Sequence, residues 1–167
     1  MADLLPDVVR EIEAHVAEGG WDQPARLFAL VDTAELITRE PQLAPALGAA
    51  GGITPLEQEE LPDYASLEEL LAGLAWPEDV AGAAVVVERV ILPPGAEAAL
   101  PADEAEALRV LSEHPDRQEV RLAVAVLRDG SRHAALRLRS HDADADVLHG
   151  PDLVPGLADS LAATLEP

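Results

Sequence analysis

The residues that most resemble a metal site lie in the last third of the chain. They are one histidine and three aspartates at alternating positions, His141, Asp142, Asp144 and Asp146. Alternating carboxylates are typical of the first half of a calcium loop, because hard cations prefer several oxygen ligands. Counted from Asp142, however, the glycine position of such a loop holds Val147 and its final glutamate position holds Leu153. The pattern favours a solvated acidic loop, and a weak metal site is the alternative.

A second group of candidate residues lies on the two segments that precede this loop. It comprises three arginines and one histidine, Arg121, His133, Arg137 and Arg139. Small alanines separate them, so the guanidinium groups would gather over a shallow floor and hold a carboxylate or phosphate through paired hydrogen bonds. The same arginines would equally pair with the chain's own carboxylates or with a partner subunit. We favour the ion-pair interpretation, and a small-anion site is the alternative.

The common catalytic motifs are missing from the sequence. It contains no glycine-rich phosphate loop, no GxGxxG, no HExxH and no GxSxG. There is no lysine for a Schiff base, and no cysteine for a thiolate nucleophile, a zinc thiolate site or a disulfide. These absences favour a non-catalytic protein without a cofactor over an enzyme.

Helical patterns dominate the first part of the chain, residues 1–78. Residues 3–18 carry an apolar stripe at the helical period and end at a glycine pair. A second helix is predicted over residues 22–39, with an aspartate as its N-cap. Capping boxes at Thr54 and at Ser66 each predict a further helix start.

The second part of the chain, residues 79–167, combines strands with helices. Apolar runs and turn signals predict three strands near 81–92, 118–128 and 131–140, and helices near 102–114 and 154–165. The order predicts an α+β fold in which the helical part packs on a small antiparallel sheet. At 167 residues, the whole chain fits a single domain.

The last two strands are predicted to form a hairpin, because Asp129 and Gly130 separate them. A two-residue loop would place the valines of one strand opposite arginines of the other. A three-residue loop with Gly130 in the left-handed region pairs even positions with even positions and keeps one apolar face intact. We therefore predict the three-residue loop, from Arg128 to Gly130.

The charge of the chain excludes some classes of partner. Thirty-two acidic residues against 11 arginines give a net charge of −21. Such a field repels phosphate backbones and anionic lipid surfaces, which argues against nucleic-acid or membrane binding. No segment has the length and apolar character of a membrane span, and the first residues lack a secretory signal. We expect a soluble, cytoplasmic protein.

Several short segments are characteristic in their order: Trp21–Pro24, Arg26–Val31, Leu61–Pro62, Trp76–Pro77, Val87–Arg89, Leu92–Pro94, His114–Arg117 and Asp152–Leu157. Together they resemble a family of small acidic proteins from actinobacteria, uncharacterised and conserved-hypothetical, over nearly the whole chain. The segments have no catalytic meaning, so the resemblance implies a source and carries over no functional residues. The use of arginine without lysine agrees with this, since it is typical of a high-GC genome.

The sequence therefore favours a non-catalytic interaction protein, such as an adaptor, a chaperone-like binder or a subunit of a larger assembly. Its expected partner is another protein or a second copy of the chain. The alternative is a protein that binds a small anion or a metal-dependent ligand, or a hydrolase, that uses the arginines of the hairpin.

Overall fold

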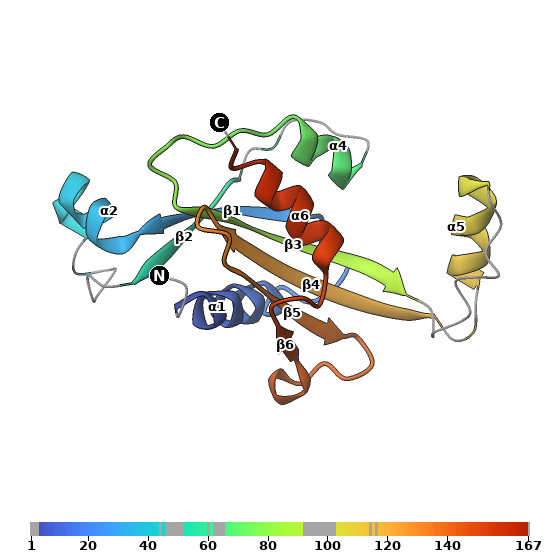
Figure 1. The fold of residues 1–167 in the computed structure, drawn as a ribbon. Helices are drawn as coiled ribbons and strands as arrows, with labels where there is room; N and C mark the ends of the chain where they lie inside the picture. Colours follow the sequence, from blue (N-terminus) through green and yellow to red (C-terminus); the bar gives the residue numbers. More distant parts are fainter. Residues whose placement is uncertain are drawn as a thin grey trace.

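One antiparallel sheet organises the chain in the computed structural model, which describes residues 4–43, 45, 52–59, 61, 66–91, 103–113, 115 and 117–166 (Figure 1). Six strands are hydrogen-bonded in the order β2-β1-β3-β4-β5-β6. Their bounds are β1 (Arg26–Asp32), β2 (Ile53–Glu57), β3 (Gly82–Ile91), β4 (Gln118–Leu127), β5 (Arg132–Leu138) and β6 (Leu148–Gly150). The predicted α+β class is confirmed, and the sheet is larger than the three predicted strands.

Helices cover both faces of this sheet. They are α1 (Leu5–Ala17), α2 (Thr33–Arg39), α4 (Leu67–Ala72), α5 (Glu104–Glu113) and α6 (Pro155–Ala163), with short 3-10 turns at Pro41–Leu43 and Asp144–Asp146. Helix α1 lies across one face, α4 and α6 lie on the other, and α5 lies beside the far ends of β3 and β4 (Figure 1). Within the described ranges, no helix is long and apolar enough to span a membrane.

Each face of the sheet has its own apolar core. The side under α1 is floored by small residues of the central strands, Ala84, Ala123, Ala125 and Ala135. The side under α4 and α6 is larger and contains mainly leucine and valine, among them Leu70, Val85, Leu122, Val124 and Leu161. Double burial explains why the run Ala83–Val87 of β3 is continuously apolar, since a strand segment covered on both faces needs no polar alternation.

The hairpin of β4 and β5 has the predicted register. Leu122 lies opposite Leu136, so even positions pair with even positions. The amide of Leu127 donates to the carbonyl of Ser131 at 2.9 Å across the loop, and Gly130 has a φ of +93°. The three-residue loop with a left-handed glycine is confirmed.

The helix predicted over residues 22–39 is wrong in its first half. Strand β1 occupies this part, and α2 begins only after it, where the side chain of Asp32 accepts a hydrogen bond from the amide of Glu35 at 3.1 Å. The run Leu27–Val31 is buried throughout, because β1 lies inside the sheet between β2 and β3. A short, fully apolar run fits a buried strand as well as a buried helix, so its periodicity does not separate the two.

The helix predicted to begin at Thr54 is also wrong, because strand β2 stands in its place. The first part of the chain therefore contributes two strands to the sheet as well as helices. Pro55 is tolerated in β2 because this is an edge strand. The amide of Gln58 donates to the carbonyl of Leu27 at 2.8 Å, and bonded positions alternate along the pair, so the nitrogen of Pro55 faces away from β1.

The capping box at Ser66 does begin a helix. The Ser66 hydroxyl accepts a hydrogen bond from the amide of Glu69 at 3.1 Å, and α4 follows it. Helices α1, α5 and α6 lie within the ranges predicted for the first helix and the last two, and residues 3, 102 and 114 of those ranges lie outside the described residues.

Candidate functional site

The hairpin register brings two arginines into direct opposition on the face that α1 covers. Arg121 of β4 pairs with Arg137 of β5 in the strand ladder. Their exposed fractions are 0% and 2%, because α1 lies over this face. The shallow floor predicted for these arginines to hold a ligand is therefore the buried interior between the sheet and the helix.

Arg137 is surrounded by carboxylates of the chain itself. Its Nε and Nη2 donate to the two carboxylate oxygens of Glu13, both at 2.7 Å. Its Nη1 donates to the backbone carbonyl of Asp142 at 2.8 Å and to the side chain of that residue at 3.0 Å, and Nη2 also reaches Asp144 at 2.5 Å. These bonds raise the pKa of Arg137 further above its usual value, and the pair that Arg137 donates to Glu13 is the largest cause. The guanidinium is therefore permanently charged and fully engaged.

Arg121 has fewer polar partners and a stacked aromatic ring. Its Nη2 donates to the carbonyl of Gly20 and lies 3.3 Å from a carboxylate oxygen of Glu88, the residue opposite it on β3. The ring of Trp21 covers the guanidinium, with 4.4 Å from Cζ to the ring centroid. Within the described residues, Nε and Nη1 of Arg121 have no hydrogen-bond partner.

The loop between α1 and β1 covers the cluster formed by Arg121, Arg137 and the groups that bind them. Glu88 accepts hydrogen bonds from the backbone amides of Asp22 and Gln23, at 2.8 and 3.0 Å. Trp21 Nε1 donates to Asp142 at 3.0 Å, and this bond is the first cause of a pKa of Asp142 below its usual value. Gly20 and Asp22 both have positive φ, at +80° and +66°, which turns the indole over the sheet. The loop therefore ties together residues from β3, β4 and the segment after β5.

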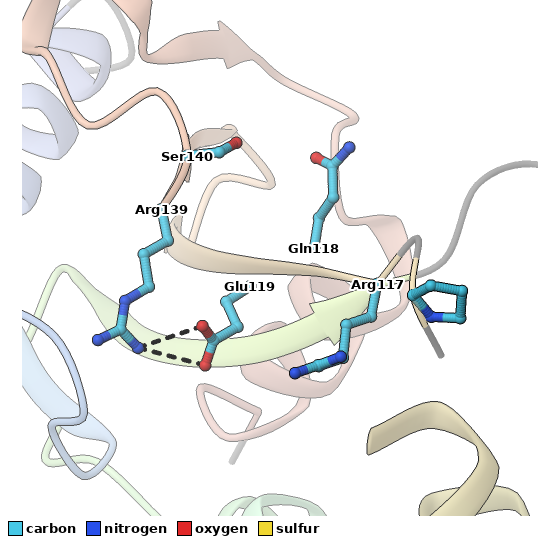
Figure 2. Close-up of a pocket in the computed structure, with 6 residues that line it drawn as sticks. Arg117, Gln118, Glu119, Arg139 and Ser140 are labelled. Atoms are coloured by element: carbon cyan, nitrogen blue, oxygen red, sulfur yellow. Dashed lines mark hydrogen bonds and ion pairs between the residues drawn. The ribbon is translucent and has the colours of Figure 1, made fainter. Parts of the chain in front are cut away.

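Arg139 lies at the rim of the cluster and is 39% exposed. It pairs with Asp22 at 3.1 Å and with Glu119 at 3.2 Å, and Asp22 is the first cause of a raised pKa of Arg139. Figure 2 shows the Glu119 carboxylate turned toward Arg139 at the edge of a hollow of about 400 Å³. The charge of Arg139 at this hollow is thus already neutralised by Glu119, which belongs to the wall of the hollow.

His133 belongs to a different pair. Its ring stacks on that of His149 in β6, with 5.5 Å between centroids, and its Nε2 lies 3.3 Å from the Nδ1 of His149. Burial is the first cause that lowers the pKa of each of these histidines. The structure therefore separates His133 from the three arginines with which the sequence grouped it.

The acidic segment after β5 supports the arginine cluster. Asp142 and Asp144 both bind Arg137, and His141 Nδ1 lies 3.0 Å from the hydroxyl of Ser140. Asp146 is exposed in the 3-10 turn. In the ranges that the structure describes, no three histidine, aspartate or glutamate side chains lie close enough together to hold a metal ion.

The charges of the cluster decide what it can do chemically. The three arginines are matched by six carboxylates: Glu13, Asp22, Glu88, Glu119, Asp142 and Asp144. The local charge is negative on a strongly negative protein, and a negative field opposes the approach of phosphate or carboxylate ligands. The geometry is that of a buried ion-pair network that joins α1, the loop after it and the sheet.

Glu13 is a member of the cluster that sequence reasoning missed, although a signal was present. It lies four residues after Val9 and three before Val16, both of which are buried on the apolar stripe of α1. A glutamate on that stripe must meet a cation inside the protein, because an unpaired buried carboxylate is strongly unfavourable.

Comparison with known proteins identifies a family. No curated protein and no solved structure matches the chain. The model of one protein family, described as PPA1309-like protein, matches residues 5–166. The chain therefore belongs to the PPA1309-like protein family.

Proposed function

We propose that this protein is a non-catalytic interaction protein that acts in the cytoplasm of an actinobacterium by binding another protein. The observation that carries the proposal is the engagement of Arg121 and Arg137 by the chain's own carboxylates and backbone. These two arginines, which were the strongest candidates for ligand binding in the sequence, instead bind groups of the chain itself and stabilise the fold. The compartment and the source are supported by the absence of cysteine and by the use of arginine without lysine.

The hollows of the described surface support binding rather than catalysis. One of about 400 Å³ lies on the α6 side of the sheet and is floored by aliphatic side chains, including Leu71, Leu122 and Leu157. Its polar wall carries the ion pair of Arg89 with Glu68, at 3.3 Å. Its lining contains no histidine and no cysteine, and its one serine, Ser160, lies beside aliphatic residues. An apolar floor with a charged rim is the composition of a protein-binding surface.

Affinity capture with the full-length, tagged chain from an extract of its source organism tests the proposal. We expect at least one protein that is retained in fixed stoichiometry and that forms a discrete complex when both proteins are purified and mixed. Size-exclusion chromatography with light scattering measures this complex. A chain that stays strictly monomeric and retains no protein at any salt concentration would contradict the proposal.

The alternative, a protein that binds a small anion, is favoured by one observation: two buried nitrogens of Arg121 find no acceptor among the residues that the structure describes. Thermal-shift measurements with phosphorylated metabolites and divalent cations test it. A ligand at about 100 times its Kd stabilises the native state by about 2.7 kcal/mol, which is readily seen as a rise in Tm. We expect no such rise. A rise that Arg139→Gln abolishes would replace our proposal with this alternative.

A further inference from the structure

Helix α1 and the β2 edge of the sheet enclose a groove that has not yet been assigned a role. Its volume is about 470 Å³. Phe28 of β1 and Pro55 of β2 form its floor with Ile12 and Ala14 of α1, and two glutamates of α1, Glu11 and Glu18, stand on its rim. The floor is apolar and the rim is acidic.

The two rim glutamates lie on one side of α1. They are seven residues apart, which is close to two helical turns and about 10 Å along the axis. Ala14 lies between them in sequence, at the helical spacing that places it on the same flank. Both carboxylates are exposed. The groove therefore presents two negative charges, about 10 Å apart, on either side of an apolar patch.

The other charged residues of the groove do not cancel these glutamates. Glu57 of β2 also lines the groove, but Arg26 binds it through two hydrogen bonds of 2.9 and 2.5 Å. His15 lies on the rim and is 3.9 Å from Glu18, the edge of ion-pair distance. In the described part of the chain, Glu11 forms no ion pair, and the neighbouring Arg10 pairs with Asp7 at 3.3 Å instead. The rim thus keeps a net negative charge.

We infer that this groove binds a basic amphipathic segment of a partner protein, with an apolar anchor between two cationic side chains about 10 Å apart. The inference rests on the proposed function and names the chemistry of the partner. Complementary charge steers such a segment to a protein with a net charge of −21, and the apolar floor then holds the anchor.

Two features exclude other occupants of the groove. A second copy of the chain would bring another acidic surface against the acidic rim, which costs energy through like-charge repulsion. An added β-strand would need the amides of the β2 edge, and Pro55 lacks one at the position that faces outward. The partner therefore binds through side chains in the groove rather than through backbone pairing.

The probe for this inference is a synthetic, fluorescein-labelled helical peptide of about 15 residues, the length at which isolated helices begin to form. It carries arginines at positions i and i+7 and leucines at i+3 and i+4 on an alanine and glutamine background. A matched peptide carries glutamates in place of the arginines. Fluorescence anisotropy with the full-length protein at low salt measures binding, and we expect the basic peptide alone to bind.

Two groove variants and one control locate the binding. Glu11→Gln with Glu18→Gln removes the rim charges and should weaken binding roughly tenfold, the usual effect of two exposed ion pairs. Ala14→Arg places a long cation on the floor and should abolish binding. The control, Glu106→Gln with Glu113→Gln, removes the same charge from exposed positions on α5 and should leave the affinity unchanged.

The outcomes separate this inference from the proposed function. Equal weakening by the groove and control variants would overturn it, because the attraction would then come from the overall charge. Failure of the wild-type protein to bind the basic peptide would overturn it as well. If a partner captured from the source organism binds the groove variants normally, the inference fails while the proposed function stands. If no partner and no peptide binds, both fail.

Discussion

Glu13 of α1 and Arg137 of β5 form a buried ion pair through two hydrogen bonds of 2.7 Å between residues 124 positions apart in the chain. Both side chains are 3% exposed or less. The pair ties α1 to a sheet face that is floored by alanines, and we predict that it fixes the height and rotation of the helix there. On this hypothesis the pair supplies specificity where apolar packing is shallow, as some buried polar groups in proteins do.

Removal of one partner of this pair should be strongly destabilising. We expect Glu13→Ala to lower the free energy of unfolding by about 3–5 kcal/mol, because the guanidinium of Arg137 would remain buried without its main acceptor. The double variant Glu13→Leu with Arg137→Met should recover most of this loss, since an apolar pair of similar size needs no desolvation of charge. Urea unfolding measures all three proteins.

Asp144 provides the matched control, because its carboxylate binds the same guanidinium but is 81% exposed. Asp144→Asn should cost less than about 1 kcal/mol, as exposed ion pairs do. If Glu13→Ala cost no more than Asp144→Asn, the pair would not determine how α1 packs.

Close packing at the start of β3 predicts a second large effect. A methyl group on Gly82 would lie 2.3 Å from the carbonyl oxygen of Val126 on β4. We expect Gly82→Ala to destabilise the protein by about 1–3 kcal/mol, because the backbones of two central strands would have to separate. Gly156→Ala is the control: nothing lies within 4 Å of its added methyl group, and alanine favours the helix by up to about 1 kcal/mol. Thermal unfolding should therefore show opposite shifts in Tm for the two variants.

Trp21 should contribute to stability through its ring and its N–H together. Trp21→Ala removes the cover of Arg121 and the bond to Asp142, and we expect a loss of about 2–3 kcal/mol. Trp21→Phe keeps a π face over Arg121 and should lose about 1 kcal/mol. Unfolding followed by the fluorescence of Trp76, which donates to Thr164 at 2.9 Å in another part of the fold, measures both variants in the same way. Equal losses would show that the ring itself contributes nothing.

The histidine pair predicts how stability depends on pH. Burial holds the pKa values of His133 and His149 below the usual value of about 6.5, so the unfolded chain binds protons more readily than the native protein. The stabilisation is fully present above pH ~6.5 and is lost as the pH falls from there through the lower native pKa values. The urea concentration at the midpoint of unfolding should therefore decrease as the pH is lowered from about 8 to about 5.

Replacement of both histidines by asparagine should flatten this part of the pH profile, and replacement of the exposed His15 should leave it unchanged. Hydrogen bonds lower the pKa values of the Asp142 and Glu57 carboxylates. The stability that these two groups contribute is therefore lost in a separate pH range, below about pH 4. A wild-type profile that is already flat between pH 7 and 5 would contradict the prediction.

The sequence predicted the elements whose patterns are local. Ser66, followed three residues later by Glu69, marked the start of α4. The alternation of apolar residues in β4 and β5, together with the three-residue loop that ends at Gly130, specified the hairpin register. Local pattern failed for β1 and β2. Leu27–Val31 is apolar at every position, and the capping signal at Thr54 is overridden because Ile53 is needed in the core.

The sequence by itself determined which residues of the hairpin share a face, because the side chains of a strand alternate with a strict period of two. It thereby placed Arg121 and Arg137 on the same side of the sheet. Only the tertiary structure decided that this side is an interior, since α1 crosses it and brings Glu13 to Arg137 from the other end of the chain. The physical reason is that burial and ion pairing join segments far apart in sequence, whereas periodicity describes only neighbours along it.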